Sequence, residues 1–424
     1  MELVKKLYGL LGLRYLRKRF VTVPKIKYYN RRKENIIRKI KEHKHLNVVF
    51  FPMNISMWKY DDLVSLLLKH PDVTTYIVPL LLPVNSTDYN KKLQDEMREY
   101  FTQKGFQFID GYDFATGQWF DPKTLNPDVI YYTQPYNVSH QYYKLEHFWD
   151  NSVFMYSPYG IVVEYLEGFY NTLFLNIAHK LFYPTVFNLK DAEELAENKG
   201  ANVVVTGYPT EDLFRTKKSD FRNVWKQKEA EIKRVIWAPH HSINSSDTLC
   251  YSTFLHVADQ MLDLCRTYNG KVQFVFKPHP TLKTKLYALD DWGKERTDRY
   301  YSLWADMPNS TIVDGDYVEL FQTSDAMIHD CSSFTVEYLY VNKPVMYLSK
   351  SDHLDVANEL GRLCYNQHYH GANIEQVRNF LENVVVAEVD DMKDQRGAFL
   401  HEFLTSKGGT VAENIYKETI SLLD

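Results

Sequence analysis

Short apolar runs, each followed by a helix-type segment, recur along this chain and constrain its fold more than any other feature. The clearest are Leu46–Phe51, Val235–Ala238 and Val272–Phe276, which are rich in β-branched and aromatic residues. Amphipathic stretches such as Tyr89–Lys104 lie between the runs. Strands that are apolar throughout and alternate with helices are typical of parallel sheets covered on both faces. We therefore predict an α/β protein with doubly wound parallel sheets.

A charged helical stretch that stops at a glycine, Asp191–Gly200, divides this alternation into two series. The 424 residues, 45% of them hydrophobic, suffice for more than one buried core. We predict a basic N-terminal arm over residues 1–44, an N-terminal Rossmann-like acceptor domain over 45–195, and a C-terminal Rossmann-like donor domain over 196–424 that ends in a closing helix. Two tandem Rossmann-like domains form the GT-B glycosyltransferase architecture.

The net charge of −4 conceals a strong asymmetry between the arm and the remainder of the chain. Residues 1–44 hold fifteen Lys and Arg and three Glu, a balance of +12, which leaves −16 for the remainder. Leu and Tyr recur among these cations at helical spacing, as in helices that bind anionic membrane surfaces. The alternative is a helix packed on its own domain with a solvated basic face. The acidic remainder, with no recognised nucleic-acid motif, predicts no nucleic-acid partner.

The cysteine pattern and the hydropathy of the chain indicate in which compartment of the cell the protein is expected. Four cysteines show no CxxC and no metal-ligand spacing, which indicates neither a disulfide framework nor a zinc site, and no cofactor or divalent metal is indicated. No apolar stretch reaches the roughly 18 to 20 residues that span a bilayer, and the N-terminus lacks a cleavage signal. We predict a cytoplasmic protein that is peripheral on the inner face of the membrane through residues 1–44.

Three apolar runs of the second series end in residues suited to phosphate. The first continues into Pro239-His240-His241, the second into Lys277-Pro278-His279, and the third into His329-Asp330-Cys331-Ser332-Ser333. Because the carboxyl ends of parallel strands share one edge of a sheet, we expect these residues to face one crevice. Two serines at a helix start hold phosphate through hydroxyl and backbone N–H groups, although such serines also serve as ordinary helix caps.

Five motifs of the second half occur in the order found in the CDP-glycerol glycerophosphotransferase family of teichoic-acid polymerases, primases and capsule enzymes. The motifs are Thr206–Pro209, Trp237–Pro239, Lys277–Pro280, His329–Ser333 and Gly408–Ile415. The chain resembles this family, which implies a GT-B fold and transfer of a polyol phosphate, glycerol phosphate foremost, from a CDP-linked donor. The acceptor would be a hydroxyl of a saccharide or lipid-linked molecule in teichoic-acid-like or capsular polymer synthesis, and CMP would be released.

The resemblance also assigns roles to residues of this sequence. It implies that His279 lies near the donor pyrophosphate and that Ser332 and Ser333 hold phosphate oxygens. From the residues themselves, His279, His240 and His241 are the catalytic candidates because imidazole titrates near neutral pH. The predicted donor-binding residues are Lys277, His329, Asp330, Ser332, Ser333 and Glu337.

The sequence does not decide which residue is the general base or which class of reaction is catalysed. The family carries a His-Gly-Thr segment where this chain has Tyr156–Gly160. The candidate bases are therefore His240 or His241, with His140 and Glu164 as N-domain candidates and Glu164 placed on a predicted helix. Two other functions remain: a GT-B glycosyltransferase that uses a sugar nucleotide, and a catalytically degenerate scaffold of polysaccharide assembly. Fold alone does not choose among them.

Overall fold

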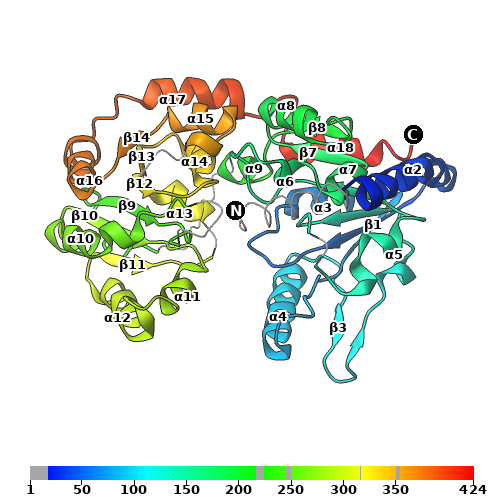
Figure 1. Cartoon of the computed structure of the whole chain (residues 1–424), viewed down its shortest axis with the longest axis horizontal. Helices are drawn as coiled ribbons and strands as arrows, with labels where there is room; N and C mark the ends of the chain where they lie inside the picture. The colour runs from blue at the N-terminus through cyan, green and yellow to red at the C-terminus, as the bar shows by residue number, and fades with distance from the viewer. Residues whose placement is uncertain (1–17, 137, 216–223, 245–249, 316, 350–353) are drawn as a thin grey trace, which may run out of the picture. The chain divides into compact units, whose positions relative to one another are not determined.

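The computed structural model describes residues 18–136, 138–215, 224–244, 250–315, 317–349 and 354–424. The chain forms two compact units: unit 1 comprises Met1–Gly160, Leu166–Pro209 and Ser406–Asp424, and unit 2 comprises Ile161–Tyr165 and Thr210–Thr405. Each unit is built on a six-stranded parallel sheet flanked by helices (Figure 1). The prediction of an α/β protein with two Rossmann-like domains is confirmed.

The sheet of unit 1 has the strand order β2-β1-β5-β6-β7-β8. Its strands are β1 (Leu46–Phe51), β2 (Val73–Ile77), β5 (Val129–Tyr132), β6 (Val153–Tyr156), β7 (Lys180–Tyr183) and β8 (Val203–Val205), and β3 (Tyr112–Asp113) and β4 (Gln118–Trp119) form a small hairpin. The helices are α2 (Val23–His43), α3 (Asp61–Leu67), α4 (Thr87–Gln103), α5 (Leu145–Phe148), α6 (Glu167–Tyr170), α7 (Leu173–Ile177), α8 (Val186–Leu195) and α18 (Val411–Ile420). The rings of Phe50 and Tyr131 stack in its core, with centroids 4.7 Å apart.

Two elements of unit 1 lie beyond residue 195, where the sequence places the domain boundary. Strand β8 pairs with β7 in the register Leu181↔Val203, so the chain stays in unit 1 as far as Pro209. Helix α18 also packs on unit 1, where the Thr419 and Tyr131 hydroxyls are 2.6 Å apart. A capping box formed by Thr410 and Glu413 starts this helix.

The sheet of unit 2 has the strand order β11-β10-β9-β12-β13-β14. Its strands are β9 (Lys233–Ala238), β10 (Val272–Phe276), β11 (Ser310–Ile312), β12 (Ala326–His329), β13 (Val345–Leu348) and β14 (Tyr369–Gly371). The helices are α9 (Thr210–Arg215), α10 (Phe254–Thr267), α11 (Leu282–Tyr287), α12 (Gly293–Asp306), α13 (Val318–Thr323), α14 (Phe334–Glu337), α15 (Glu359–Tyr365), α16 (Ile374–Phe380) and α17 (Lys393–Phe399). Helices α10 and α16 pack together beside the sheet (Figure 1), and Trp237 stacks on Phe276 in the core.

The order of the unit 2 strands creates a switch point between β9 and β12. From β9 the chain adds β10 and β11 on one side, and it then returns to add β12, β13 and β14 on the other side. Ligands of doubly wound proteins bind outside the carboxyl ends of the strands at such a point. The ends of β10, β9 and β12 are therefore adjacent, as the sequence predicts.

A short segment, residues 161–165, belongs to unit 2, although the residues before and after it in the sequence belong to unit 1. We call this segment the strap. The backbone N–H of Tyr165 donates to the carbonyl oxygen of Val356 (2.8 Å), and that of Asn358 donates to Val163 (2.9 Å). Glu164 forms an isolated antiparallel bridge with Ala357. The helix predicted around Glu164 is therefore replaced by extended backbone.

The N-terminal arm is helical over its described part. A π-helical turn, Lys18–Thr22, leads into α2, whose Ile26, Tyr29, Ile36 and Ile40 are buried. Residues 1–17 of the predicted membrane segment lie outside the described residues. Among the described helices, none combines the length and the apolar character needed to cross a membrane.

Candidate functional site

Three histidines meet where β9 and β10 end. The ring centroids of His240 and His241 are 4.3 Å apart, those of His241 and His279 are 4.2 Å apart, and those of His240 and His279 are 5.5 Å apart. The backbone N–H of His279 donates to the carbonyl oxygen of Pro239 (3.1 Å), so the two loops stay paired beyond the strand ends. The structure thus brings together the three predicted catalytic candidates.

Hydrogen bonds to Nδ1 define the tautomers of two of these rings. The backbone N–H of Ser242 lies 3.3 Å from Nδ1 of His240, and that of Thr281 lies 3.2 Å from Nδ1 of His279. Because a backbone N–H only donates, each Nδ1 is an acceptor and the proton of the neutral ring is on Nε2. Burial, with the neighbouring His241 and Lys277, lowers the pKa of His279 to about 4. His279 is therefore neutral at pH 7 and offers Nε2–H as a donor.

The buried Lys277 supplies positive charge behind the histidine cluster. Its ammonium group donates to the carbonyl oxygen of Gly315 (2.7 Å). Gly315 has φ +90°, a conformation that favours glycine. The lysine is thereby held near His279, whose pKa its charge helps to lower.

Asp330 fastens the end of β12 to its neighbours. The side chain is 1% exposed, and Oδ1 accepts from the backbone N–H of His240 (2.5 Å). Oδ2 accepts from the backbone N–H (2.6 Å) and the hydroxyl (2.8 Å) of Thr253, which precedes α10. Burial raises the pKa of Asp330 to about 6. Its carboxylate oxygens are engaged by protein donors, so Asp330 positions the loop that carries His240.

Two further predicted donor residues, His329 and Glu337, lie below the surface. Nδ1 of His329 accepts from the backbone N–H of Cys331 (3.2 Å), and its ring packs 5.1 Å from that of Tyr347. Helix α14, which ends at Glu337, has only four residues and continues as a 3₁₀ turn over Tyr338–Val341. So short a helix contributes little macrodipole at its N-terminus.

Ser332 and Ser333 are half-buried at the end of β12, and Ser332 is joined to the strap. The Ser332 hydroxyl donates to Oε1 of Glu164 (2.5 Å), and the Tyr251 hydroxyl donates to the same oxygen (3.1 Å). The ring of Tyr251 in turn lies 5.7 Å from that of His240. Burial and Glu164 raise the pKa of Tyr251 well above its usual range. Glu164 and Tyr251 thus connect the serine loop with the histidine cluster.

The remaining base candidate, His140, lies in unit 1 and has different surroundings, whereas Glu164, also expected in the N-terminal domain, belongs to unit 2. His140 stacks on Trp119, with centroids 4.3 Å apart and planes 1° apart, and its Nδ1 accepts from the backbone N–H of Tyr142 (3.4 Å). Burial and Lys144 lower its pKa. These contacts indicate a structural role for His140. The Tyr156–Gly160 segment begins at the last residue of β6 in unit 1.

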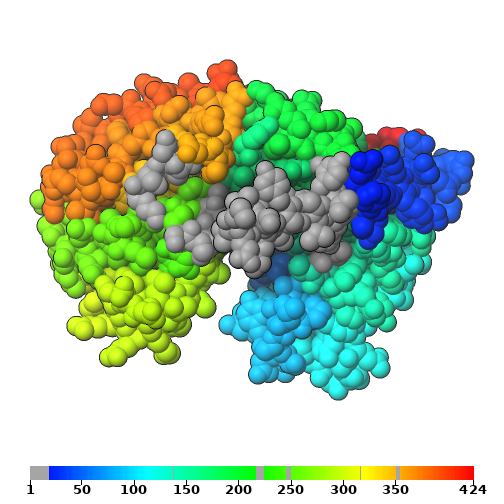
Figure 2. All heavy atoms as spheres, viewed as in Figure 1, coloured from blue at the N-terminus to red at the C-terminus, as the bar shows by residue number. Residues whose placement is uncertain are grey.

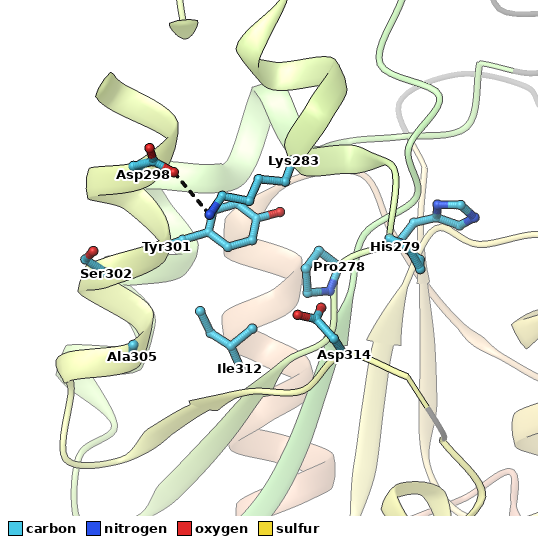
Figure 3. Close-up of a pocket in the computed structure, with 10 residues that line it drawn as sticks. Pro278, His279, Lys283, Asp298, Tyr301, Ser302, Ala305, Ile312 and Asp314 are labelled. Atoms are coloured by element: carbon cyan, nitrogen blue, oxygen red, sulfur yellow. Dashed lines mark ion pairs between the residues drawn. The ribbon is translucent and has the colours of Figure 1, made fainter. Parts of the chain in front are cut away.

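A pocket of about 620 Å³ borders His279 on the side of α11 and α12 (Figure 3). It is lined by Pro278, His279, Pro280, Lys283, Asp298, Tyr301, Ser302, Ala305, Ile312 and Asp314. Lys283 pairs with Asp298 (3.1 Å), and the imidazole of His279 points away from this pair (Figure 3). Hydrogen bonds from Tyr287, Lys294 and Lys283 hold the pKa of Asp298 well below its usual range. Lys283 and Lys294 thus share the single carboxylate of Asp298 beside this pocket.

The described part of the chain contains neither a cluster of metal-binding side chains nor a disulfide bond. Within it, no three or more His, Cys, Asp or Glu side chains are grouped so as to hold a metal ion. The four cysteines form no disulfide, and Cys265, Cys331 and Cys364 are buried.

A family model described as CDP-glycerol:poly(glycerophosphate) glycerophosphotransferase matches residues 190–421, more than half of the chain. The chain belongs to this family. The resemblance seen in the five motifs is thereby confirmed, and all five lie inside the matched range. This glycerophosphotransferase family member has no match among curated proteins.

Solved structures similar to this family member support the fold. The wall teichoic acid polymerase TagF shares 13% identity over 96% of this chain and 98% of its own, with a TM-score of 0.55. The UDP-GlcNAc 2-epimerase from Neisseria meningitidis, bound to UDP-GlcNAc, shares 12% identity over 88% and 99%, also with a TM-score of 0.55. These likenesses confirm an α/β fold of two Rossmann-like domains of the GT-B type.

Sequence reasoning missed several residues of the site. Ser242 was detectable as a local partner, since serine side chains in loops readily hydrogen-bond to nearby residues, and its hydroxyl lies 2.7 Å from Nδ1 of His240. Tyr251 and Thr253 carry no comparable signal, because their roles depend on contacts with Glu164 and Asp330 far away in the sequence.

Proposed function

We propose that this family member transfers a polyol phosphate, glycerol phosphate foremost, from a CDP-linked donor to a hydroxyl of a saccharide or lipid-linked acceptor and releases CMP. The observation that carries the proposal is the convergence of His240, His279 and Ser332 at the carboxyl ends of β9, β10 and β12. Family membership supplies the reaction class.

The reaction requires in-line displacement at the phosphorus distal to cytidine. The acceptor oxygen forms a new P–O bond, the P–O bond to CMP breaks, and the hydroxyl proton passes to a base. We assign Nε2–H of His240 and His279, the hydroxyls of Ser332 and Ser333, and the charge of Lys277 to the diphosphate, whose negative charge such preorganised donors stabilise. With those two rings as donors, His241 is the remaining histidine candidate for the base.

The supporting groups have separate tasks in this proposal. Asp330 positions His240 through its backbone, and the buried His329 and Glu337 support the serine loop from below. No role in binding donor atoms is needed for these three residues. The acceptor side is left to unit 1, where Tyr156–Gly160 replaces the family's His-Gly-Thr segment.

Calorimetric titration with CDP-glycerol, CDP-ribitol, CMP, UDP-sugars and GDP-sugars tests the donor class. We expect binding of the cytidine ligands alone, with loss of affinity by about tenfold or more in Ser332→Ala/Ser333→Ala, because each phosphate contact contributes about 1.5–3 kcal/mol. Preference for a uridine or guanosine sugar would instead indicate a sugar-nucleotide glycosyltransferase. Absence of all binding would favour a scaffold.

The exposed face of α2 supports the proposed attachment to an anionic membrane. While one face of this helix is buried, Lys27, Arg31 and Lys39 are exposed on the other, and Phe20 is 67% exposed just before the helix. Helix α2 lies at the surface of unit 1 (Figure 2). Each cation near an anionic surface contributes up to about 1 kcal/mol of binding free energy.

Vesicle co-sedimentation tests this attachment. We expect binding to phosphatidylglycerol vesicles and not to phosphatidylcholine vesicles, with a loss of at least about tenfold in Lys27→Glu/Arg31→Glu because two charges are reversed at the surface. Lys91→Glu/Lys92→Glu reverses two exposed charges on α4 of the same unit and serves as the matched control. Equal loss in both variants, or no loss in either, would refute a role for the α2 face.

A further inference from the structure

Glu164 places a carboxylate beside the serine that is assigned to phosphate. Its Oε1 lies 2.5 Å from the hydroxyl oxygen of Ser332 and 3.1 Å from that of Tyr251. A serine hydroxyl has one proton, so while Ser332 donates to Glu164 it cannot donate to a phosphate oxygen. A phosphate that binds here must compete with a resident negative charge for the same hydroxyl groups.

The strap fixes the position of this carboxylate within unit 2. Backbone hydrogen bonds join Tyr165 to Val356 and Asn358 to Val163, and the Asn358 side chain donates to the carbonyl oxygen of Val162 (3.2 Å). A Cβ added to Gly361 would lie 2.6 Å from the carbonyl oxygen of Val163, which shows how closely the strap lies against α15. The backbone that carries Glu164 therefore cannot withdraw without the loss of these contacts.

Burial makes the charge of Glu164 effective. The side chain is 4% exposed, and its surroundings are the Tyr251 ring, the serine loop and the strap itself. Water and salt screen a buried charge much less than an exposed one. An added negative charge on a phosphate near Ser332 is therefore disfavoured more strongly here than at a solvated surface.

We propose that Glu164 is a charge-selecting residue of the donor site, which disfavours phosphate monoesters relative to phosphodiesters; the inference rests on the proposed function of Ser332. In a CDP-linked polyol each phosphorus is diesterified and carries one negative charge. CMP carries nearly two charges on its phosphate at neutral pH, and CDP carries nearly two on its terminal phosphate, because the second pKa of a phosphate monoester is about 6.

This selection promotes release of the nucleotide product. Before transfer, the phosphates beside Glu164 are diesters with the smaller charge. When the P–O bond to CMP breaks, the leaving phosphate becomes a monoester, and its additional charge is repelled by the buried carboxylate. Glu164 thus weakens the binding of the nucleotide product without an equal loss of donor affinity.

Calorimetric titration of the full chain with CDP-glycerol, CMP and CDP tests the proposal in Glu164→Gln. The amide retains a carbonyl oxygen for Ser332 and Tyr251, removes the charge, and places an NH2 group where the second carboxylate oxygen was. We expect the affinity for CMP or CDP to rise by about tenfold or more and that for CDP-glycerol to change by less than about threefold. The nucleotide with the larger gain identifies which phosphate lies at Ser332. CMP should also inhibit turnover of this variant more strongly.

Controls separate this inference from the proposed function. Glu295→Gln removes an exposed carboxylate from α12 of the same unit and should leave all three affinities unchanged. Ser332→Ala should weaken all three ligands. Equal tightening of all three ligands in Glu164→Gln, or weakening of all three in a folded variant, would overturn charge selection while leaving the donor site intact. If the unaltered protein binds none of the three, the proposed function itself fails, and this inference fails with it.

Discussion

Replacement of His279 by alanine is expected to reduce donor-dependent turnover by about 100-fold or more, the usual effect of removing one preorganised donor from a developing negative charge. Nδ1 of His279 accepts from the backbone N–H and lies 3.0 Å from the hydroxyl of Thr281, so the ring is held with Nε2–H available. Alanine removes that donor, and neither His240 nor His241 can replace it without leaving its own position. The rate of CMP release from CDP-glycerol measures the effect.

Two variants make this result specific to the imidazole. His256→Ala removes an exposed histidine of α10 in the same unit and should leave turnover unchanged. His279→Gln offers a side-chain N–H in place of Nε2–H and should recover part of the rate. Turnover of His279→Ala within a few fold of the unaltered protein, with the fold intact, would show that the donor site has been placed wrongly.

Asp330→Ala is expected to lower the free energy of unfolding of unit 2 by roughly 3 kcal/mol, since each buried donor left without an acceptor costs about 1–3 kcal/mol. The substitution leaves the backbone N–H groups of His240 and Thr253, and the hydroxyl of Thr253, without their acceptor. Urea unfolding monitored by tryptophan fluorescence reports the change, because Trp237 and Trp304 lie in the core of this unit.

Asp330 also makes the free energy of unfolding depend on pH in a predictable direction. Burial raises the pKa of Asp330 from 3.8 to about 6, so the folded state binds its proton more tightly than the unfolded state. The stabilisation from this proton is fully present below about pH 4 and is lost as the pH rises through about 6. Asp330→Asn should remove this dependence, whereas the exposed Asp355→Ala should change neither stability nor its pH profile. An unchanged midpoint in Asp330→Ala would contradict the positioning role.

The strand ends were predictable because their signals are local. Apolar runs that stop at Pro239 and Pro278 show directly where β9 and β10 end, and parallel topology then brings the histidines that follow to one edge. The network around Glu164 was not predictable, because Ser332 lies 168 residues further along the chain. Its segment is too short for any periodicity, and so a helix was predicted where a strap is found.

Neighbouring residues of the His329–Ser333 motif also differ in where their side chains point, which the sequence does not show. His329, Asp330 and Ser332 are neighbours in sequence, but the first two point into the protein and the hydroxyl of Ser332 faces the strap. A motif indicates which residues occur at a strand end, whereas the alternation of side chains along extended backbone decides which of them can meet a ligand. Only packing against Tyr347 and Thr253 shows on which side each side chain lies.

The return of α18 to unit 1 affects how the protein is made. During synthesis the chain emerges from the ribosome in order, so all of unit 2 is translated before Val411–Ile420 becomes available to unit 1. Until then the surface that α18 covers, including the Tyr131 hydroxyl, lacks its partner. Unit 2 can therefore finish folding on a nascent chain whose first unit is still incomplete, and a ribosome that stalls before residue 411 would leave the surface that α18 covers exposed.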